Sequence, residues 1–171
     1  MAIIVPSGSR SSSSTPLLAL HAYNPSPSGT ETIYTTASTT LHVIDQTNMA
    51  ISFTAPASGA VIVSVCAHWI PSQGGATQGG IIHGAMMESG SVVCGPNIIC
   101  RDVTGNNFTD PVTLTVRWLA TGLTPGSAHT YALAICADLT TGTTVGVAVG
   151  GTGLATNAGP ALFEVWDAAT A

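Results

Sequence analysis

The stretch "FTAPASGAVIVSV", Phe53 to Val65, decides the fold class of this chain. A Pro/Ser/Gly turn leads directly into an almost continuous apolar run that contains no charged residue. Turn residues followed by a Val- and Ile-rich run are typical of a strand that is covered on both faces. If the run continues to Ile70, alternation places Val61, Val63, Val65, Ala67 and Trp69 on one face and Ile62, Ser64, Cys66 and His68 on the other. We therefore expect a central strand, covered by a second sheet on one face and by a loop, an arm or another subunit on the other.

From about residue 39 onward, short runs rich in Val, Ile and Thr are again separated by turn residues, and the apolar residues show no helical period. The run "NMAISFTA" (48–55) places Met49, Ile51 and Phe53 on one face, and "TPGS" (124–127) fits a turn with Pro second and Gly third. Further strands are expected at 39–45, 81–88, 111–123, 128–139, 143–153 and 159–168, with two short strands or a strand and a turn at 91–103. Seven to nine strands of this kind predict an all-β fold, an antiparallel β-sandwich of the jelly-roll type over residues 39–171.

Residues 1–38 differ from the rest because short apolar patches alternate with Ser/Pro/Gly stretches. One interpretation is a disordered tail. A solvated tail, however, has little reason to carry large apolar side chains, so we expect an extended N-terminal arm that orders against a partner. Its expected partner-binding residues are Ile3, Ile4, Val5, Leu17, Leu18, Leu20 and Tyr23.

The charged fraction of the chain is 6%, against about 25% in ordinary globular chains. So little charge favours an assembly in which part of the surface lies against other protein. Lys is absent, and three Arg face eight acidic residues. We therefore expect neither nucleic acid nor a membrane as a partner, because both need clustered cations or a long apolar span.

The composition and motifs also exclude several kinds of chemistry. Without Lys there is no Walker A lysine and no Schiff-base nucleophile, and no G-x-S-x-G elbow occurs. The segment "GGTGLA" near Gly151 lacks the third glycine of a dinucleotide loop. We therefore expect no catalytic residue, cofactor or metal ion.

Three weaker possibilities remain open. His68, His83 and His129 lie in strands and could meet as a metal site, and the loop "RDVTGNNFTD" offers Asp102, Asn106, Asn107 and Asp110 to calcium. Separate, hydrogen-bonded histidines and a plain turn are the simpler interpretations. A sugar-binding face could be formed by Trp69, Trp118, Trp166, Tyr34 and Tyr131, although the phase of Trp69 and Trp118 favours core packing.

The four cysteines are expected to be free thiols. Cys66 and Cys136 sit in apolar runs, where Cys acts as a small buried hydrophobe. Cys94 and Cys100 flank "GPNII" and could close a loop if oxidised. The N-terminal patch "AIIV" is stopped by Pro6 and has no basic region before it, so synthesis in the cytoplasm is expected.

Three segments carry a resemblance to a known class of proteins: "FTAPASGAVIVSV", "TGLTPGSAHTYALAI" (121–135) and "GPALFEVWDA" (159–168). Their order resembles small virion structural proteins of phages that infect actinobacteria, of the capsid decoration, head-fibre or minor tail type. The pattern F-x-x-P-x-x-G, from Phe53 to Gly59, also resembles trimeric jelly rolls of the tumour necrosis factor and complement globular-head type.

The resemblance implies a homotrimer that binds the major capsid protein and stabilises the shell at the capsid surface, after assembly in the host cytoplasm. Two alternatives stay open. One is a minor tail or tail-tip protein with a host-glycan-binding face. The other is a jelly-roll carbohydrate-binding or metal-dependent enzyme domain.

Overall fold

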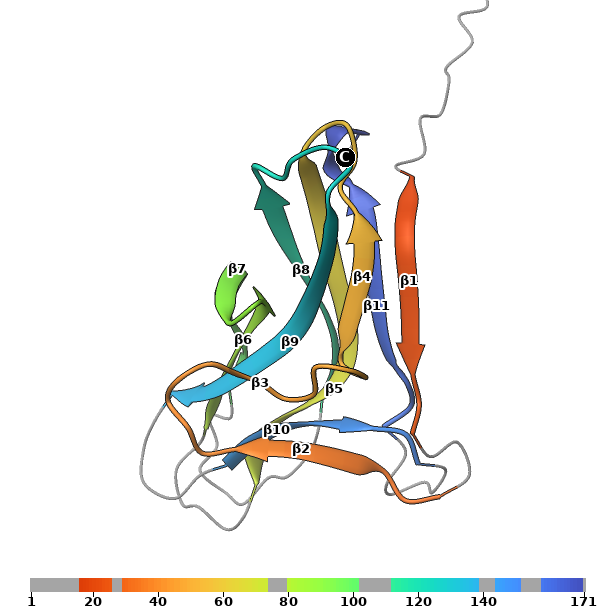
Figure 1. Cartoon of the computed structure of the whole chain (residues 1–171). Helices are drawn as coiled ribbons and strands as arrows, with labels where there is room; N and C mark the ends of the chain where they lie inside the picture. The colour runs from red at the N-terminus through yellow and green to blue at the C-terminus, as the bar shows by residue number, and fades with distance from the viewer. Residues whose placement is uncertain are drawn as a thin grey trace, which may run out of the picture.

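The computed structural model describes residues 16–25, 29–73, 80–101, 112–138, 144–151 and 158–170. These residues form strands and one short 3-10 turn (Figure 1). The elements are β1 (Leu17–Tyr23), β2 (Thr32–Thr36), β3 (His42–Val43), β4 (Ala50–Thr54), β5 (Ala60–Gln73), β6 (Ile81–Glu88), β7 (Ser91–Arg101), β8 (Val112–Thr121), β9 (Ala128–Asp138), β10 (Thr144–Val149), β11 (Ala161–Asp167) and η1 (Ala168–Thr170). No helix in these ranges is long and apolar enough to cross a bilayer.

The strands form two antiparallel sheets packed face to face, which confirms the predicted sandwich. Their pairing is nested: β1 pairs with β11, β4 with β9, β5 with β8, and β6 with β7. The chain therefore follows one long hairpin whose strand pairs lie alternately in the first and the second sheet, which is the jelly-roll path. The first sheet contains β1, β11, β5, β8, β10 and β2, and the second contains β3, β4, β9, β6 and β7.

Strand β5, which begins within the stretch Phe53 to Val65, is the central strand of the first sheet. The first half of β5 lies between β11 and β8, and its second half also pairs with β10. Its predicted inward residues are all buried: Val61, Val63, Val65, Ala67 and Trp69. On the other face Ser64 is buried, while Ile62, Cys66 and His68 keep partial exposure.

The other strands that the alternation predicted complete the core. Met49, Ile51 and Phe53 from the β4 region pack against Tyr131, Leu133 and Ile135 of β9, and all six are buried. The predicted turn before β9 is also present: Gly126 has φ 82° and Ser127 N–H donates to the carbonyl of Thr124 at 3.0 Å.

The structure corrects the prediction for residues 91–103. Instead of two short strands or a strand and a turn, residues Ser91–Arg101 form one strand, β7, along the edge of the second sheet. Register shifts in its pairing with β6 accommodate Gly95 and Pro96 without ending the strand. Edge strands tolerate proline because one side of the backbone needs no partner in the sheet.

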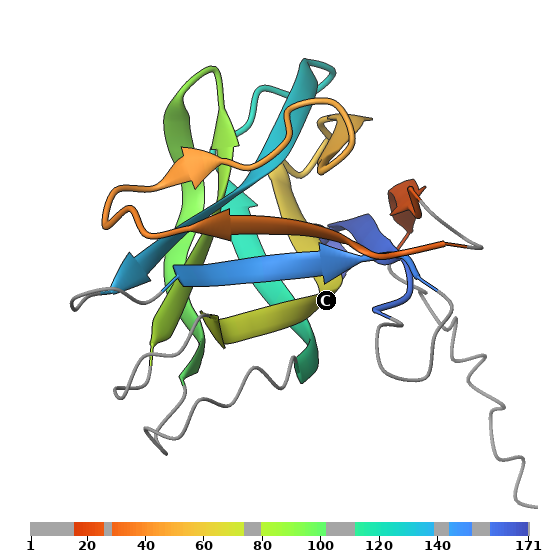
Figure 2. The same cartoon turned by 90° about the horizontal axis from the view of Figure 1, so that it is seen from below.

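The segment 1–38 is not a single arm that stands apart from the sandwich. Residues 1–15 and 26–28 lie outside the described residues, but β1 and β2 are strands of the first sheet. Figure 1 shows β1 beside β11, and Figure 2 shows β2 beside β10. Sequence alternation in "LLALHAY" is too short to reveal that its partner is a strand about 140 residues later, because only the closed fold brings the two together.

Hydrogen bonds hold this N-terminal part to the sandwich. The Tyr34 hydroxyl donates to Asp45 Oδ2 at 2.9 Å and lies 3.4 Å from the Tyr23 hydroxyl. Asp45 Oδ1 accepts the backbone N–H groups of Thr47 and Asn48, both at 2.9 Å. One carboxylate therefore joins β2 to the loop between β3 and β4, and orders that loop.

Candidate functional site

The outer face of the first sheet is the main candidate surface. Cross-strand register aligns its side chains in rows over β1, β11, β5 and β8. One row is Leu17, Trp166, Ile62 and Leu119, and another is Ala22, Leu162, Cys66 and Thr115. Both rows consist mainly of apolar side chains that point away from the core.

Several of these side chains are open to solvent. Leu119 is 60% exposed, Leu20 58% and Leu17 44%, while Ile62, Leu162 and Trp166 are half-buried. Large apolar side chains gathered on one face of a sheet indicate an interaction surface, whereas scattered single ones do not.

On the outer faces of β1, β11, β5 and β8, the Asp, Glu and Arg side chains of the described residues lie in the row between these two. Its members are Leu20, Glu164, Ser64 and Arg117, so the face has one carboxylate on β11 and one guanidinium on β8. The described residues contain no ion pair between Glu164 and Arg117, which flank the buried Ser64. The face therefore offers one negative and one positive group to a partner.

The predicted arm residues fall into three groups. Leu17 and Leu20 point outward on this face, whereas Leu18 and Tyr23 pack against the core. Ile3, Ile4 and Val5 lie outside the described residues. The structure thus brings two of the predicted residues to the candidate surface together with side chains from β5, β8 and β11. Of these side chains, sequence analysis had named only Trp166, and it had considered that residue for a sugar-binding face.

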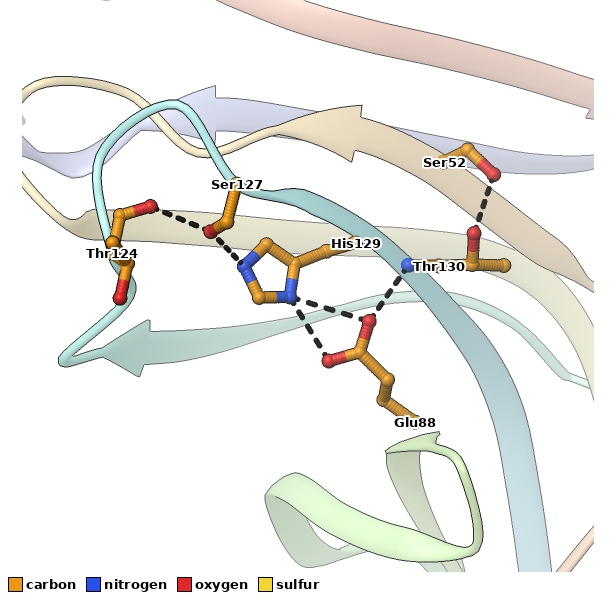
Figure 3. A network of polar contacts seen from close by, with 6 residues as sticks. All are labelled: Ser52, Glu88, Thr124, Ser127, His129 and Thr130. Carbon is orange, nitrogen blue, oxygen red and sulfur yellow. Dashed lines mark hydrogen bonds and ion pairs between the residues drawn. The ribbon is translucent and has the colours of Figure 1, made fainter.

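A second cluster is polar and lies at one end of the second sheet (Figure 3). His129 Nδ1 lies 2.9 Å from Glu88 Oε2, and His129 Nε2 lies 2.7 Å from Ser127 Oγ. Glu88 Oε1 also accepts the backbone N–H of Thr130 at 2.9 Å. The imidazole stacks on Phe53 with 5.5 Å between ring centroids.

In space, Ser127, His129 and Glu88 follow one another as the serine, histidine and acid of a catalytic triad do. The hydrogen of the serine hydroxyl, however, is not directed at the histidine. The Ser127 hydroxyl donates its one hydrogen to the carbonyl of Thr124. With the hydroxyl hydrogen in that bond, Ser127 Oγ meets His129 Nε2 as an acceptor, which is not the arrangement of a serine nucleophile and its general base. The cluster as it stands joins the turn before β9 to the end of β6.

The three histidines considered as a metal site are on different strands. His68 Nδ1 contacts Thr113 Oγ1 at 2.6 Å, and His83 Nε2 lies 3.5 Å from Asp138 Oδ2. Among the residues that the structure describes, no three His, Cys, Asp or Glu side chains come together to hold a metal ion. The possible calcium ligands at 102–110 lie outside these residues.

The aromatic residues considered for a sugar-binding face do not form one. Trp69, Trp118 and Tyr131 are buried in the core, while Trp166 and Tyr34 are half-buried and belong to different strands of the first sheet. The ring NH of Trp69 donates to the carbonyl of Leu114 at 3.1 Å. The phase of Trp69 and Trp118 with their neighbouring Val and Leu residues had predicted this outcome.

The cysteines are free, as predicted. Burial raises the pKa of Cys94 and of Cys100 to about 11. Neither thiol is therefore a reactive thiolate near neutral pH.

Comparison of the sequence with models of known protein families found no match, and comparison with curated proteins found no similar sequence.

Proposed function

We propose that this protein is a non-enzymatic structural component of a virion, of the capsid decoration type. It assembles as a homotrimer through the outer face of the first sheet, binds the major capsid protein and stabilises the shell. The observation that carries the proposal is the apolar outer face of the first sheet, in a chain whose charged fraction is 6%.

Self-association is supported by the chemistry of that face. Leu17, Leu20 and Leu119 are exposed, and burial of such area against another copy stabilises by about 25 cal/mol per Å². A specific interface of about 1,600 Å² in total would need much of this face. The single Glu164 and the single Arg117 make the surface self-complementary in charge, because the carboxylate of one copy can meet the guanidinium of the next.

The virion assignment and the number of three subunits come from the resemblance of three segments, and the jelly-roll path agrees with the fold that this resemblance implies. A packaged genome pushes a shell outward. A trimer that ties neighbouring capsid subunits together opposes this pressure by binding, which requires no catalytic group. The apolar residues Ile3, Ile4 and Val5 precede β1 and are the proposed capsid anchors.

The role of the outer face of the first sheet in self-association can be tested with one matched pair of substitutions. Leu119 and Ile98 are almost equally exposed, at 60% and 62%, but Leu119 is on the outer face of the first sheet and Ile98 is on β7 of the second. Light scattering of the wild type should give three times the 17.1 kDa chain mass. Leu119→Asp should weaken association at least ten-fold, because a buried unpaired carboxylate replaces an apolar contact.

Ile98→Asp should leave the trimer intact, and circular dichroism should show that both variants keep the sheet fold. A wild type that is monomeric at micromolar concentration contradicts the proposal. So does a Leu119→Asp variant that associates as tightly as the wild type.

A further inference from the structure

A groove runs from β1 of the first sheet past β4 to the outer side of the second sheet, away from Leu119 and Arg117. It consists of two adjoining depressions of about 360 and 560 Å³, which share Gln46, Thr47 and Thr130 as lining residues. One end reaches Leu20 and His21 on β1, and the other reaches Glu88 and Ser89 at the end of β6. The groove is therefore elongated and open, which suits an extended ligand.

Five of the lining residues carry neutral groups that form hydrogen bonds, and most of the other lining residues are apolar. The neutral groups are the amide of Gln46 and the hydroxyls of Thr47, Ser52, Ser89 and Thr130. A hydroxyl both donates and accepts, so it matches another hydroxyl in either direction. The lining contains the carboxylate of Glu88 but no Lys or Arg.

Several of these groups are held in place before any ligand binds. Ser52 Oγ and Thr130 Oγ1 are 2.8 Å apart across the paired strands β4 and β9. Glu88 is fixed by His129 and by the Thr130 N–H, both at 2.9 Å (Figure 3). Asp45 orders the loop that carries Gln46 and Thr47 through its bonds to the N–H groups of Thr47 and Asn48. Preorganised polar groups bind at a smaller entropic cost than flexible ones.

From this arrangement we propose that the groove binds a neutral oligosaccharide. A polyanionic glycan would meet the carboxylate of Glu88, and the lining has no Lys or Arg to bind its charges, because its basic side chains are His21 and His129 and His129 is already paired with Glu88. A lipid or an apolar peptide would leave the hydroxyls and the amide without partners.

This inference does not rest on the proposed function. It concerns a groove that is lined mainly by the second sheet and its loops, and its test uses residues that are absent from the self-association test. Only Leu20, at one end of the groove, also belongs to the outer face of the first sheet.

The test is a glycan array that carries neutral hexose, N-acetylhexosamine and deoxyhexose oligomers together with sialylated and uronic acid oligomers. Hits are then titrated into the isotope-labelled full chain and followed by amide NMR. Neutral oligomers should bind, with shifts at Thr47, Ser52 and Thr130. Thr130→Val, which keeps the shape of the side chain but removes the hydroxyl, should weaken binding about ten-fold.

The matched control is Thr115→Val, which removes an exposed strand hydroxyl on the outer face of the first sheet and should not change binding. Ser52→Ala gives a second variant should Thr130→Val fail to fold. Three outcomes would overturn the proposal: no neutral oligomer binds at millimolar concentration, anionic oligomers bind more tightly than neutral ones, or both groove variants bind as the wild type does.

Discussion

Gly146 and Gly90 are needed for different physical reasons. A Cβ on Gly146 would lie 2.5 Å from the carbonyl oxygen of Tyr34, in the neighbouring strand β2. A Cβ on Gly90 would meet nothing within 4 Å, but Gly90 has φ 82° in the two-residue turn between β6 and β7. The first position is limited by space and the second by backbone conformation.

We therefore expect Gly146→Ala to lower the free energy of unfolding by about 3 kcal/mol, because a backbone atom must move. Gly90→Ala should cost about 1 to 2 kcal/mol, the penalty for a left-handed conformation. Urea denaturation measures both, and hydrogen exchange should show that only Gly146→Ala loosens β2. Equal costs would contradict this distinction.

At the scale of elements, the loop between β3 and β4 depends on one carboxylate. Partial burial of Asp45 raises its pKa, but the hydrogen bonds from Asn48, Thr47 and Tyr34 outweigh this effect and lower the pKa to about 2. The ordinary value for Asp is 3.8, so the unfolded chain binds the proton more readily than the folded one between these two values. The stabilisation by Asp45 is present above about pH 4 and is lost as the pH falls through about 2.

Asp45→Asn should lower the free energy of unfolding by about 1 kcal/mol near neutral pH. The difference from the wild type should shrink as the pH falls and vanish near pH 2. Urea unfolding of both proteins at several pH values measures this, and the difference between them removes the contribution of the other acidic residues. A difference that stays constant down to pH 2 would show that the charge of Asp45 is not responsible.

The end of β6 shows how distant elements form one polar cluster. Glu88 and His129 are 41 residues apart in the chain and meet at 2.9 Å because β6 pairs with β9. His129 was singled out as one of three possible metal ligands, whereas the structure gives it Ser127 and Glu88 as partners. Sequence spacing carries no signal for this, because strand register alone determines which side chains face each other.

At the scale of the whole molecule, the position of β1 decides how an N-terminal arm can work. A deletion of residues 1–30 would remove β1, which pairs with β11 along one edge of the first sheet, and would damage the sandwich. Deletion of residues 1–15 leaves β1 complete. The deletion of residues 1–15 therefore tests the anchoring role of the first residues without removing a strand of the sandwich.

We expect the protein without residues 1–15 to remain a trimer and to lose its co-sedimentation with capsids. The full chain should be present in hundreds of copies in each particle, which quantitative mass spectrometry of purified virions measures. Ile3→Ser with Ile4→Ser provides a milder version of the deletion. Co-sedimentation of the shortened protein at the wild-type level would contradict the anchoring role of the first residues.

The sequence alone determined the all-β class, the central position of residues 60–70, the inward faces of β4 and β5, and the turn at 124–127. Each of these depends on alternation or on turn residues, which act between near neighbours along the chain. Only the tertiary structure decided that β1 completes the first sheet, that β7 is one strand, and which side chains share the apolar face and the groove. These features arise from pairing between strands that are far apart in the chain, and local periodicity contains no information about the partner.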